Sequence, residues 1–457
     1  MKWLISILVS ILLVGCSFDD KTGIWNDASN IPVEISRSDT INKKKVNSRF
    51  EDVFIDKKIF NEEKELDKNF NFKIENALDN TNWPQEFASN TNNVSNFKYN
   101  DNKLLISKSS KLSKTLGSKY SLIKNTVLYN KKIISYDHKG SIFVYSFENK
   151  KKILEFNFYK KAFKEYNKKI FLVVNENKIY AADNLGYVYA IDIETRTLIW
   201  AKNYGIPFRS NIKFFDGQLF LANQDNIVYS IKAKNGEKNW QLSSSVTFLK
   251  SEFKNNIVID ELNNNIIFIN TSGELYSLNY LNQRINWVLN FKNFSLKGDT
   301  DLFLSQPLAI KDGNLFVSTE NSLLSYNLIT GSRNWIKPVA PILKPIITKN
   351  NVFTFTKNDL LICIDRKTGD IRWSKNIYLS IKKPKKMRKI GEIFNLSIAN
   401  DNINLFSHEG YLLSFDFRDG TSNFFGKISK HGISSVPIFS KGNMFLTDGK
   451  NKVLKFN

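Results

Sequence analysis

The sequence predicts an all-β fold: an eight-bladed β-propeller of four-stranded antiparallel blades, preceded by a lipoprotein signal and a flexible tether. The first observation is composition. Aromatic residues make up 13% of the 457 residues, with 36 Phe and 17 Tyr, and such side chains favour strands over helices. The second is a repeated frame, in which a turn residue is followed fourteen positions later by Trp. The third is the period, because the copies start 38 to 51 residues apart, which suits one blade each.

Residues 1–15 are predicted to be a lipoprotein signal peptide. Lys2 supplies a positive charge, and the apolar run 4–14 is too short to span a bilayer but fits the core of a signal peptide. The run ends in Leu13-Val14-Gly15-Cys16, and small residues just before a Cys form a bacterial lipobox. Cleavage would leave Cys16 at the N-terminus with diacylglycerol on its thiol, and several acyl chains give stable anchoring. The alternative is a plain signal peptide followed by a chance Cys.

The residue after the lipobox bears on the destination of the protein. Ser17, and not Asp, follows Cys16. By resemblance to enterobacterial lipoproteins, this predicts the outer membrane, with the protein on its periplasmic side. The second cysteine, Cys363, lies in an apolar run and is predicted to be a buried, inert thiol. Disulfides therefore play no part in the predicted fold.

Residues 16–80 are predicted to be a flexible tether, and residues 81–457 the propeller. The tether segment is polar, rich in Asp, Asn, Lys and Ser, and has little apolar periodicity. Such a segment cannot bury enough apolar surface to offset the entropy lost on ordering.

The clearest copy of the repeat runs from Gly186 to Trp200. Its turn residue tolerates a positive φ, and apolar residues then alternate at the strand period of two. Five further copies end in an aromatic residue, one ends in Leu, and an eighth starts near the C-terminus. These copies are Asn226 to Trp240, Gly273 to Trp287, Asn321 to Trp335, Asp359 to Trp373, Gly410 to Phe424, Gly140 to Leu154, and Asn451 onward.

Two positions inside the frame have a physical explanation. Six residues after the turn residue stands a short polar side chain that can bond the backbone of the next turn, as Asp192 and Asp365 do. Ten residues after it, four copies carry Gly, such as Gly369, which permits a tight reversal into the last strand. The closing Trp can bury a large flat surface against the adjacent blade.

The last copy lacks its outer strand, so an earlier segment must close the ring and cover the open edge. Counting back from Gly140 by the spacing of the other copies places the end of the missing strand between residues 103 and 116. We therefore predict that residues 103–107 pair with residues 453–456.

The net charge is +22. It indicates either a polyanionic partner or biased coding, since Lys, Asn, Ile and Phe are all over-used. The densest basic run, 382–389, falls in the longest gap between copies. It is predicted to be an exposed loop, either simply solvated or touching anionic lipid or an acidic partner. A nucleic-acid role conflicts with export.

The sequence contains no pattern typical of catalysis. The three histidines, His138, His408 and His431, are spread over different copies, so no convergent metal ligands are expected. The chain has no Gly-x-Ser-x-Gly elbow, Walker loop, metalloprotease helix or haem-binding Cys pair. We expect no catalytic residue, no metal and no cofactor.

The repeat resembles the PQQ-like repeat of quinoprotein-type propellers, over roughly residues 100–457. The frames Gly186 to Trp200 and Asp359 to Trp373 match it most closely. With a lipobox and no other domain, the chain resembles the BamB-type lipoproteins of the outer-membrane β-barrel assembly machinery. Trp83-Pro84-Gln85, Asn90 and Asn92-Asn93 resemble the segment before the propeller in alphaproteobacterial members.

The resemblance implies a function and a docking loop. In that family the propeller docks through loops onto periplasmic domains of the barrel-inserting subunit, one loop containing Leu-Arg-Gly. The nearest match here is Phe294 to Gly298, which makes Leu296 and Lys297 candidate partner-binding residues. Lys replaces Arg, and the loop follows the fourth copy rather than the third. An ordinary inter-blade loop is the alternative.

The favoured interpretation is a non-catalytic scaffold lipoprotein, monomeric within a hetero-complex, that binds the assembly core subunit. Unfolded outer-membrane proteins are a second candidate partner, and the membrane is reached through the lipid anchor. The alternatives are a periplasmic PQQ-dependent dehydrogenase-like quinoprotein and a propeller that binds polysaccharide or lipid.

Overall fold

The structure is a computed structural model that describes residues 16–18, 25–27, 58–66, 72, 75–114, 124–159, 163, 165–245, 256–291, 303–379 and 388–457. The chain divides into two units, Met1–Asp56 and Lys57–Asn457. In the first unit, β1 (Cys16–Phe18) and β2 (Trp25–Asp27) form an antiparallel pair with Cys16 opposite Asp27. Within the described part of the chain, no helix has the length and apolar character needed to cross a membrane.

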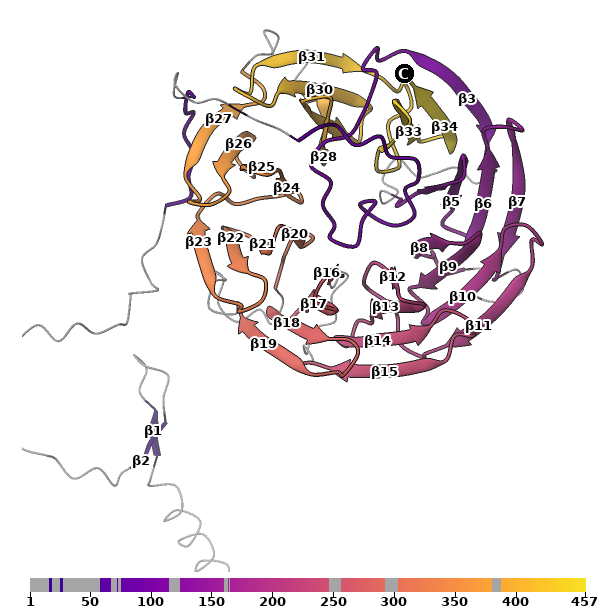
Figure 1. Ribbon diagram of the computed structural model, residues 1–457, viewed down its shortest axis with the longest axis horizontal. Helices are drawn as coiled ribbons and strands as arrows, with labels where there is room; N and C mark the ends of the chain where they lie inside the picture. Colours follow the sequence, from indigo (N-terminus) through magenta and orange to yellow (C-terminus); the bar gives the residue numbers. More distant parts are fainter. Residues whose placement is uncertain are drawn as a thin grey trace, which may run out of the picture. The chain divides into compact units, whose positions relative to one another are not determined.

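The second unit is an eight-bladed propeller of four-stranded antiparallel sheets, which confirms the predicted fold class (Figure 1). Its first four blades are β4 (Val127–Tyr129), β5 (Lys132–Tyr136), β6 (Ser141–Ser146) and β7 (Lys151–Asn157); β8 (Ile170–Asn175), β9 (Lys178–Asp183), β10 (Tyr187–Asp192) and β11 (Leu198–Asn203); β12 (Lys213–Phe215), β13 (Gln218–Ala222), β14 (Ile227–Lys232) and β15 (Lys238–Ser243); and β16 (Asn256–Asp260), β17 (Asn265–Ile269), β18 (Glu274–Asn279) and β19 (Ile285–Asn290).

Blades five to eight continue around the ring. They are β20 (Ala309–Lys311), β21 (Asn314–Ser318), β22 (Leu323–Asn327) and β23 (Arg333–Lys337); β24 (Ile346–Ile347), β25 (Asn351–Phe355), β26 (Leu360–Asp365) and β27 (Ile371–Asn376); β28 (Ile393–Ala399), β29 (Asn402–Ser407), β30 (Tyr411–Asp416) and β31 (Ser422–Lys427); and β32 (Ile438–Ser440), β33 (Asn443–Thr447) and β34 (Lys452–Phe456), with β3 (Leu105–Lys111) as the fourth strand of blade eight.

The ring closes through β3, as predicted. Leu105 lies opposite Phe456, and Lys108 lies opposite Leu454, in an antiparallel pair with β34. The strand begins two residues later and ends four residues later than the predicted segment 103–107. The pairing joins the N-terminal side of the propeller to its C-terminal strand, so blade eight is built from both ends of the unit.

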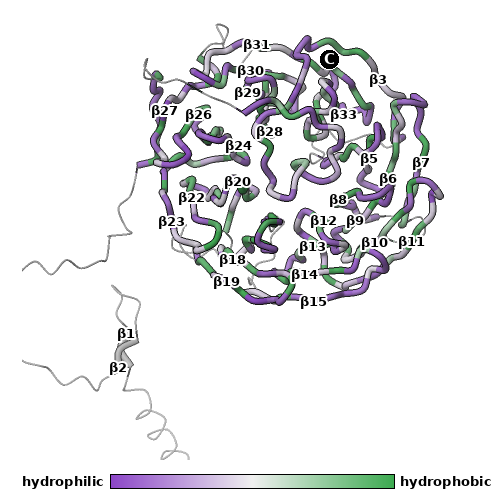
Figure 2. The backbone as a smooth tube through the Cα atoms, in the orientation of Figure 1, coloured by the Kyte–Doolittle hydropathy of each residue, from purple (hydrophilic) through white to green (hydrophobic). Residues whose placement is uncertain are grey.

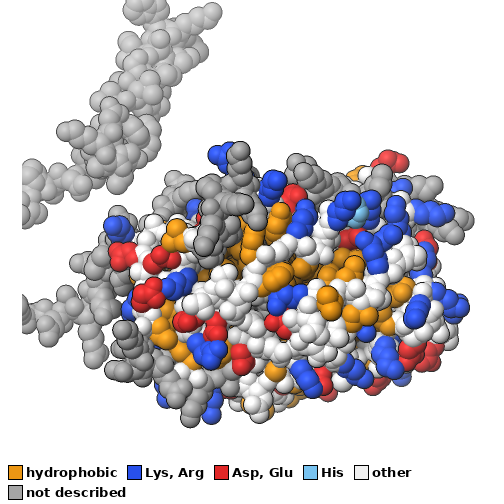
Figure 3. All heavy atoms as spheres, turned by 90° about the horizontal axis from the view of Figure 1, so that it is seen from above, with side chains coloured by type: hydrophobic (Ala, Val, Ile, Leu, Met, Phe, Trp, Pro, Cys, Tyr) orange, Lys and Arg blue, Asp and Glu red, His pale blue; other side chains and the backbone are white. Residues whose placement is uncertain are grey.

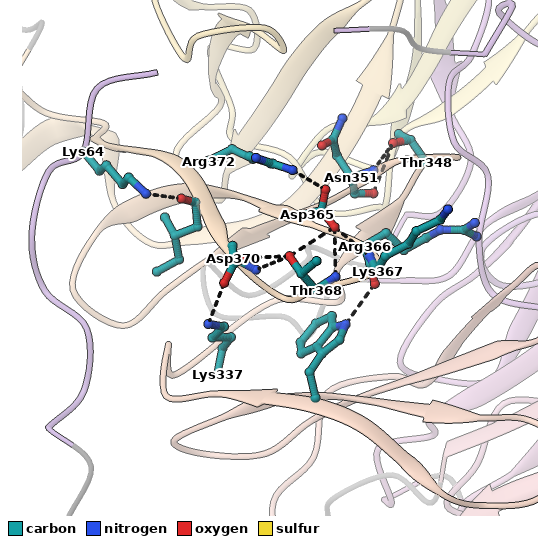
Figure 4. A network of polar contacts seen from close by, with 12 residues as sticks. Lys64, Lys337, Thr348, Asn351, Asp365, Arg366, Lys367, Thr368, Asp370 and Arg372 are labelled. Carbon is teal, nitrogen blue, oxygen red and sulfur yellow. Dashed lines mark hydrogen bonds and ion pairs between the residues drawn. The ribbon is translucent and has the colours of Figure 1, made fainter. Parts of the chain in front are cut away.

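The repeat frame covers the third and fourth strands of a blade. Gly186, at φ 89°, ends the turn before β10, and Asp192 ends that strand. In blade six the equivalent Asp365 accepts hydrogen bonds from the backbone N–H groups of Lys367 and Thr368, both at 2.9 Å (Figure 4). The predicted role of this polar position is therefore confirmed, because its carboxylate satisfies the donors of the turn between the last two strands.

The closing Trp of one blade packs on the Gly of the next. The indole Nε1 of Trp335 donates to the carbonyl of Arg366 at 2.8 Å. A Cβ placed on Gly369 would lie 2.7 Å from Cδ2 of Trp335, so only Gly fits there. Its φ of 73° is also one that L side chains rarely adopt. The predicted burial of this Trp against the neighbouring blade is confirmed.

The hydrophobic core lies between neighbouring blades. Figure 2 shows apolar stretches alternating with polar ones along the strands. One cluster joins Phe316 and Trp335 of blade five to Val352 and Ile362 of blade six, and all four side chains are buried. Each sheet thus buries both faces against its neighbours, which makes the ring one continuous packed structure.

Part of the segment predicted as tether contacts the outer edge of blade six. Lys64 and Ser374 exchange backbone hydrogen bonds of 3.1 and 2.9 Å, so residue 64 pairs with β27 on the edge that β26 leaves open. Ser374 also donates to the carbonyl of Glu62 at 2.5 Å, and the backbone N–H of Phe60 donates to Pro338 at 2.8 Å. Where the tether ends and the propeller begins therefore stays a prediction, while residues 58–66 lie against the blade.

Candidate functional site

Residues 82–100, which we call the axial strap, run across the centre of the ring and contact all eight blades in turn (Figure 1). Most contacts are made to the innermost strand of each blade. They are Trp83 with Leu128, Pro84 with Val174, Asn90 with Phe214 and Ile259, Thr91 with Ile310, Asn93 with Ile347, Phe97 with Ile398, and Asn100 with Gly442. The strap therefore makes one full circuit of the propeller axis.

Asparagine side chains fix the middle of the strap. The amide of Asn93 donates to the carbonyl of Ile347 at 2.9 Å and accepts from the backbone N–H of the same residue at 3.0 Å. The amide of Asn92 donates to Ile257 at 3.2 Å and to Leu308 at 3.0 Å. An Asn side chain carries a donor and an acceptor, as a peptide group does. It can therefore satisfy the inner edge of a strand without continuing the sheet.

The two ends of the strap pack on each other. The rings of Trp83 and Phe97 stack at a centroid distance of 5.1 Å, and Phe97 stacks on Phe439 of β32 at 5.2 Å. All three side chains are buried. Aromatic pairs of this kind contribute about 0.5–1.5 kcal/mol beyond the area they bury. The circuit is therefore closed by an apolar contact where it returns to its start.

A buried lysine holds the strap to blade three. The Nζ atom of Lys213 donates to the carbonyl of Ser89 at 2.8 Å and to Oδ1 of Asn92 at 2.6 Å. Lys213 is fully buried, and this burial lowers its pKa to about 7, although the carboxylate of Glu86 opposes the shift. The ammonium of Lys344 lowers the same pKa further. Glu261, which accepts a hydrogen bond from the strap residue Asn90 at 2.7 Å, also opposes the shift, so two cations and two carboxylates lie close to the strap.

A cavity of about 180 Å³ lies between the strap and the residues that precede or begin the innermost strands of blades one, five, six, seven and eight. The strap contributes Glu86 and Phe87 to its wall. The backbone φ of Phe87 is 62°, an uncommon value for a bulky residue. Non-glycine residues held in this region concentrate at binding sites and active sites.

Lys344 is the cation that lines this cavity. Its Nζ donates to the carbonyl of Pro345 at 3.1 Å and lies 5.3 Å from the centre of the Phe87 ring. Burial within the propeller lowers its pKa to about 7. The side chain nevertheless stays partly accessible to solvent, because the cavity itself admits water. It is therefore deep in the protein and still open to a small solute.

The axis does not fit a quinone cofactor with a calcium ion. Calcium takes six to eight oxygen ligands, whereas Glu86 is the one acidic side chain on the cavity wall. Across the described ranges, no group of three or more His, Cys, Asp or Glu side chains is placed to hold a metal. The cavity is also smaller than the roughly 300–1,000 Å³ of typical cofactor sites. We therefore assign no redox chemistry to this site.

Most residues singled out from the sequence lie elsewhere. Leu296 and Lys297 lie outside the described residues, as do residues 382–387 of the basic run. Cys16 lies in β1, where only the backbone is described. Cys363 is free and fully buried, as predicted, and burial raises its pKa well above the usual value.

The strap was noted in the sequence only as a resemblance, through Trp83-Pro84-Gln85 and Asn90, Asn92 and Asn93. Its circuit of the axis was missed. The signal that could have found it is the density of Asn and Ser over residues 89–96 after a buried aromatic residue.

The rim of the propeller carries exposed apolar side chains. Figure 3 views the molecule edge-on and shows hydrophobic side chains gathered among Lys and Arg. On the closing strand and just before it, Leu104, Leu105 and Ile106 are each at least half exposed. Exposed apolar side chains in a row are typical of surfaces that contact other molecules.

Comparison with known proteins finds relatives of the propeller. A family model described as "Outer membrane protein assembly factor BamB" matches residues 155–375. The curated BamB of Moranella endobia is 21% identical over 303 residues, which cover 60% of this chain and 71% of that protein.

Two solved structures share the fold. The crystal structure of BamB from Moraxella catarrhalis aligns with a TM-score of 0.59 at 12% identity, covering 78% of this chain and 99% of that one. The quinohemoprotein alcohol dehydrogenase of Comamonas testosteroni aligns with a TM-score of 0.60 at 10% identity, covering 83% and 81%. At these identities, the structural matches speak for the fold alone.

Proposed function

We propose, from the premise that this chain is a BamB-like propeller of the PQQ-like repeat type, that it is a non-catalytic scaffold of the outer-membrane β-barrel assembly machinery. In this proposal it binds periplasmic domains of the barrel-inserting subunit while a lipid on Cys16 holds it to the outer membrane. The similarity to curated BamB proteins supports the class of function.

The observation that carries the non-catalytic part is the strap. It hydrogen-bonds to the innermost strands of blades one to seven and to Gly442, in the turn between the first two strands of blade eight. In a propeller, the axis is where convergent side chains from several blades could build an active site. Here those innermost strands are bonded to Asn side chains and strap carbonyls, and the cavity beside Lys344 is small. The loops and the rim therefore remain as the surfaces on which a partner can bind.

The quinoprotein alternative has the fold in its favour, since a quinohemoprotein dehydrogenase aligns over most of the chain. The cavity contents argue against it, because the wall offers a single carboxylate. Adding PQQ and calcium to the purified protein tests this alternative directly. A stoichiometric bound chromophore would overturn the scaffold proposal.

The proposal is tested by affinity capture of the full-length lipoprotein from outer membranes solubilised in mild detergent. We expect the barrel-inserting subunit of the assembly machinery to be recovered. A Cys16→Ser variant should lose acylation and move to the soluble periplasmic fraction. Failure to recover the core subunit with the lipidated protein would count decisively against the scaffold role.

The docking loop is tested in the same capture. We expect the double substitution Leu296→Ala and Lys297→Glu to lower recovery of the core subunit about tenfold. The matched control is Lys349→Glu, an exposed lysine in the turn between β24 and β25. Equal recovery with the double variant and the control would exclude residues 296–297 as the contact and would leave the scaffold role itself standing.

A further inference from the structure

The axial cavity has the features of a ligand site that the scaffold function does not use. It lies at the centre of the ring and is open to water, and its wall includes Phe87, which has a φ of 62° and is followed in the strap by Ala88 at 65°. Backbone strain of this kind costs about 1–3 kcal/mol at each residue and persists only where the surroundings hold it.

The charges around the cavity define what it can bind. Lys344 makes one hydrogen bond among the described residues, to Pro345, although an ammonium has three donors. Lys213 repels it across the axis but is already bonded to the strap. Glu86 places one carboxylate on the same wall. The ammonium of Lys344 attracts an anion, and the carboxylate elsewhere on the wall repels further negative charge, so a singly charged anion is favoured over a doubly charged one.

The rest of the wall defines the body of the ligand. Phe87, Phe394, Leu396 and Val436 line the cavity, and Gln306 and Asn395 lie among them. An apolar cavity of about 150 Å³ is known to hold benzene, so about 180 Å³ accepts one aromatic ring with a small substituent. Amides beside an ammonium can complete the hydrogen bonds of a carboxylate.

We propose that the axial cavity binds a small aromatic or similarly apolar monocarboxylate, with the carboxylate on Lys344 and the ring against Phe87 and Phe394. Because the strap supplies part of the wall, the bound ligand also holds the strap in place. This site is independent of any docking through the loops.

Benzoate is the probe, titrated by calorimetry into the full-length protein. We expect saturable one-to-one binding with a dissociation constant of about 1 mM or lower. Benzamide, which has the same shape without the charge, and inorganic phosphate, which is a mixture of monoanion and dianion near pH 7 and has no apolar body, should bind at least about tenfold more weakly. These two comparisons need no variant protein.

Two lysine variants locate the site. Lys344→Met keeps an unbranched side chain that is one atom shorter and removes its charge, so benzoate affinity should fall at least about tenfold. Lys349→Met, an exposed lysine five residues along, should bind benzoate as the parent does. The thermal midpoint of each variant shows whether it folds.

The pH dependence gives a further readout. Burial lowers the pKa of Lys344 to about 7, so affinity for benzoate should fall by up to about tenfold for each pH unit above 7, as the ammonium loses its proton. Lys213 faces the same axis with its pKa also lowered to about 7, and Glu86 and Glu261 lie near it as fixed charges, so the dependence left in Lys344→Met is that of Lys213. No saturation with benzoate, or equal affinity for benzoate and benzamide, would overturn the proposal.

Discussion

Single residues fix how neighbouring blades meet. The polar residue six positions after the turn residue and the Gly ten positions after it could be predicted, because each acts within its own turn, where sequence spacing equals spatial spacing. The partner of that Gly could not. Gly369 is shaped by Trp335, which comes from the preceding blade, 34 positions earlier in the chain. A local pattern shows that a flat side chain will be buried, but not which backbone it covers.

Gly369→Ala is expected to cost more than the same change at Gly313. Both residues have a φ near 70°, so an Ala at either position is destabilised by the left-handed backbone by about 1–2 kcal/mol. Only at Gly369 does the new methyl group meet an indole, whereas a Cβ on Gly313 meets open space. We expect a further loss of about 1–3 kcal/mol in the free energy of unfolding, measured in urea. Equal losses in the two variants would contradict the Trp–Gly contact.

The buried carboxyl group of Asp183 makes the stability of the folded protein depend on pH. The side chain is fully buried, and burial raises its pKa to about 6 against the hydrogen bonds from the backbone N–H groups of Tyr187 and Leu185. Its Oδ2 and the hydroxyl of Tyr189 have no hydrogen-bond partner among the described residues. In the next blade, Asn223 and Tyr229 occupy the equivalent positions and are hydrogen-bonded at 3.3 Å.

We therefore expect Asp183→Asn to stabilise the protein above pH 6. The folded pKa lies above the unfolded value, so the stabilisation from the protonated form is present below about pH 4 and is lost as the pH rises through 6. The rise in the pKa of Asp183 from 3.8 to about 6 corresponds to at most about 3 kcal/mol in the free energy of unfolding. Urea unfolding at pH 8 should show a gain of about 1–3 kcal/mol, and unfolding at pH 4 should show almost none.

Asp137 is the matched control for this change. It occupies the equivalent place in blade one, but its Oδ2 accepts a hydrogen bond from Ser113 at 2.7 Å. Asp137→Asn should therefore give no gain at pH 8. A gain in both variants would show that loss of negative charge, and not the unpaired buried oxygen, is responsible.

At the scale of elements, regular strands could be predicted and the irregular strap could not. The strand that closes the ring was found by counting along the period, which works because every blade repeats the same spacing. The axial strap has no period, and its hydrogen bonds run from side chains to strands up to about 250 residues away, as between Asn93 and Ile347. The cavity was equally hidden, because its wall comes from segments as far apart as Glu86 and Val436.

Asn93→Ala is expected to loosen the strap and leave the blades folded. The change removes both hydrogen bonds to Ile347 and leaves a buried backbone N–H without a partner, at a cost of about 1–3 kcal/mol. Amide hydrogen exchange should accelerate at residues 83–97 by tenfold or more, while exchange in β25 and β26 stays slow.

Lys98→Ala serves as the control for the strap. Lys98 lies on the same segment, but its ion pair with Asp79 is exposed on both sides and contributes little. Its exchange pattern should match that of the parent. If Asn93→Ala also leaves exchange in the strap unchanged, its amide does not hold the segment in place.

At the scale of the whole molecule, two segments cover outer strand edges, and they have different consequences. β3 covers β34 and joins blade eight into a closed ring. Residues 62–66 cover β27, the outer strand of blade six, and that blade already has its four strands. Closure turns eight local sheets into one cooperative unit, because without it blades one and eight become ends that can open separately. The segment at β27 has no such role.

Replacing each segment with a Gly-Ser stretch of equal length separates closure from edge cover. Replacement of residues 105–111 removes the strand that pairs with Leu454 and Phe456 and exposes the edge of β34. We expect a fall in the thermal midpoint of several degrees or more and concentration-dependent association through the open edge, measured by calorimetry and light scattering. Replacement of residues 62–66 removes contacts to Ser374 but leaves the ring closed, so its midpoint should move by no more than a degree or two and the protein should stay monomeric. If the two replacements proved equally mild, β3 would be a cover like the other segment, and the blades would hold together by their Trp–Gly contacts without a latch.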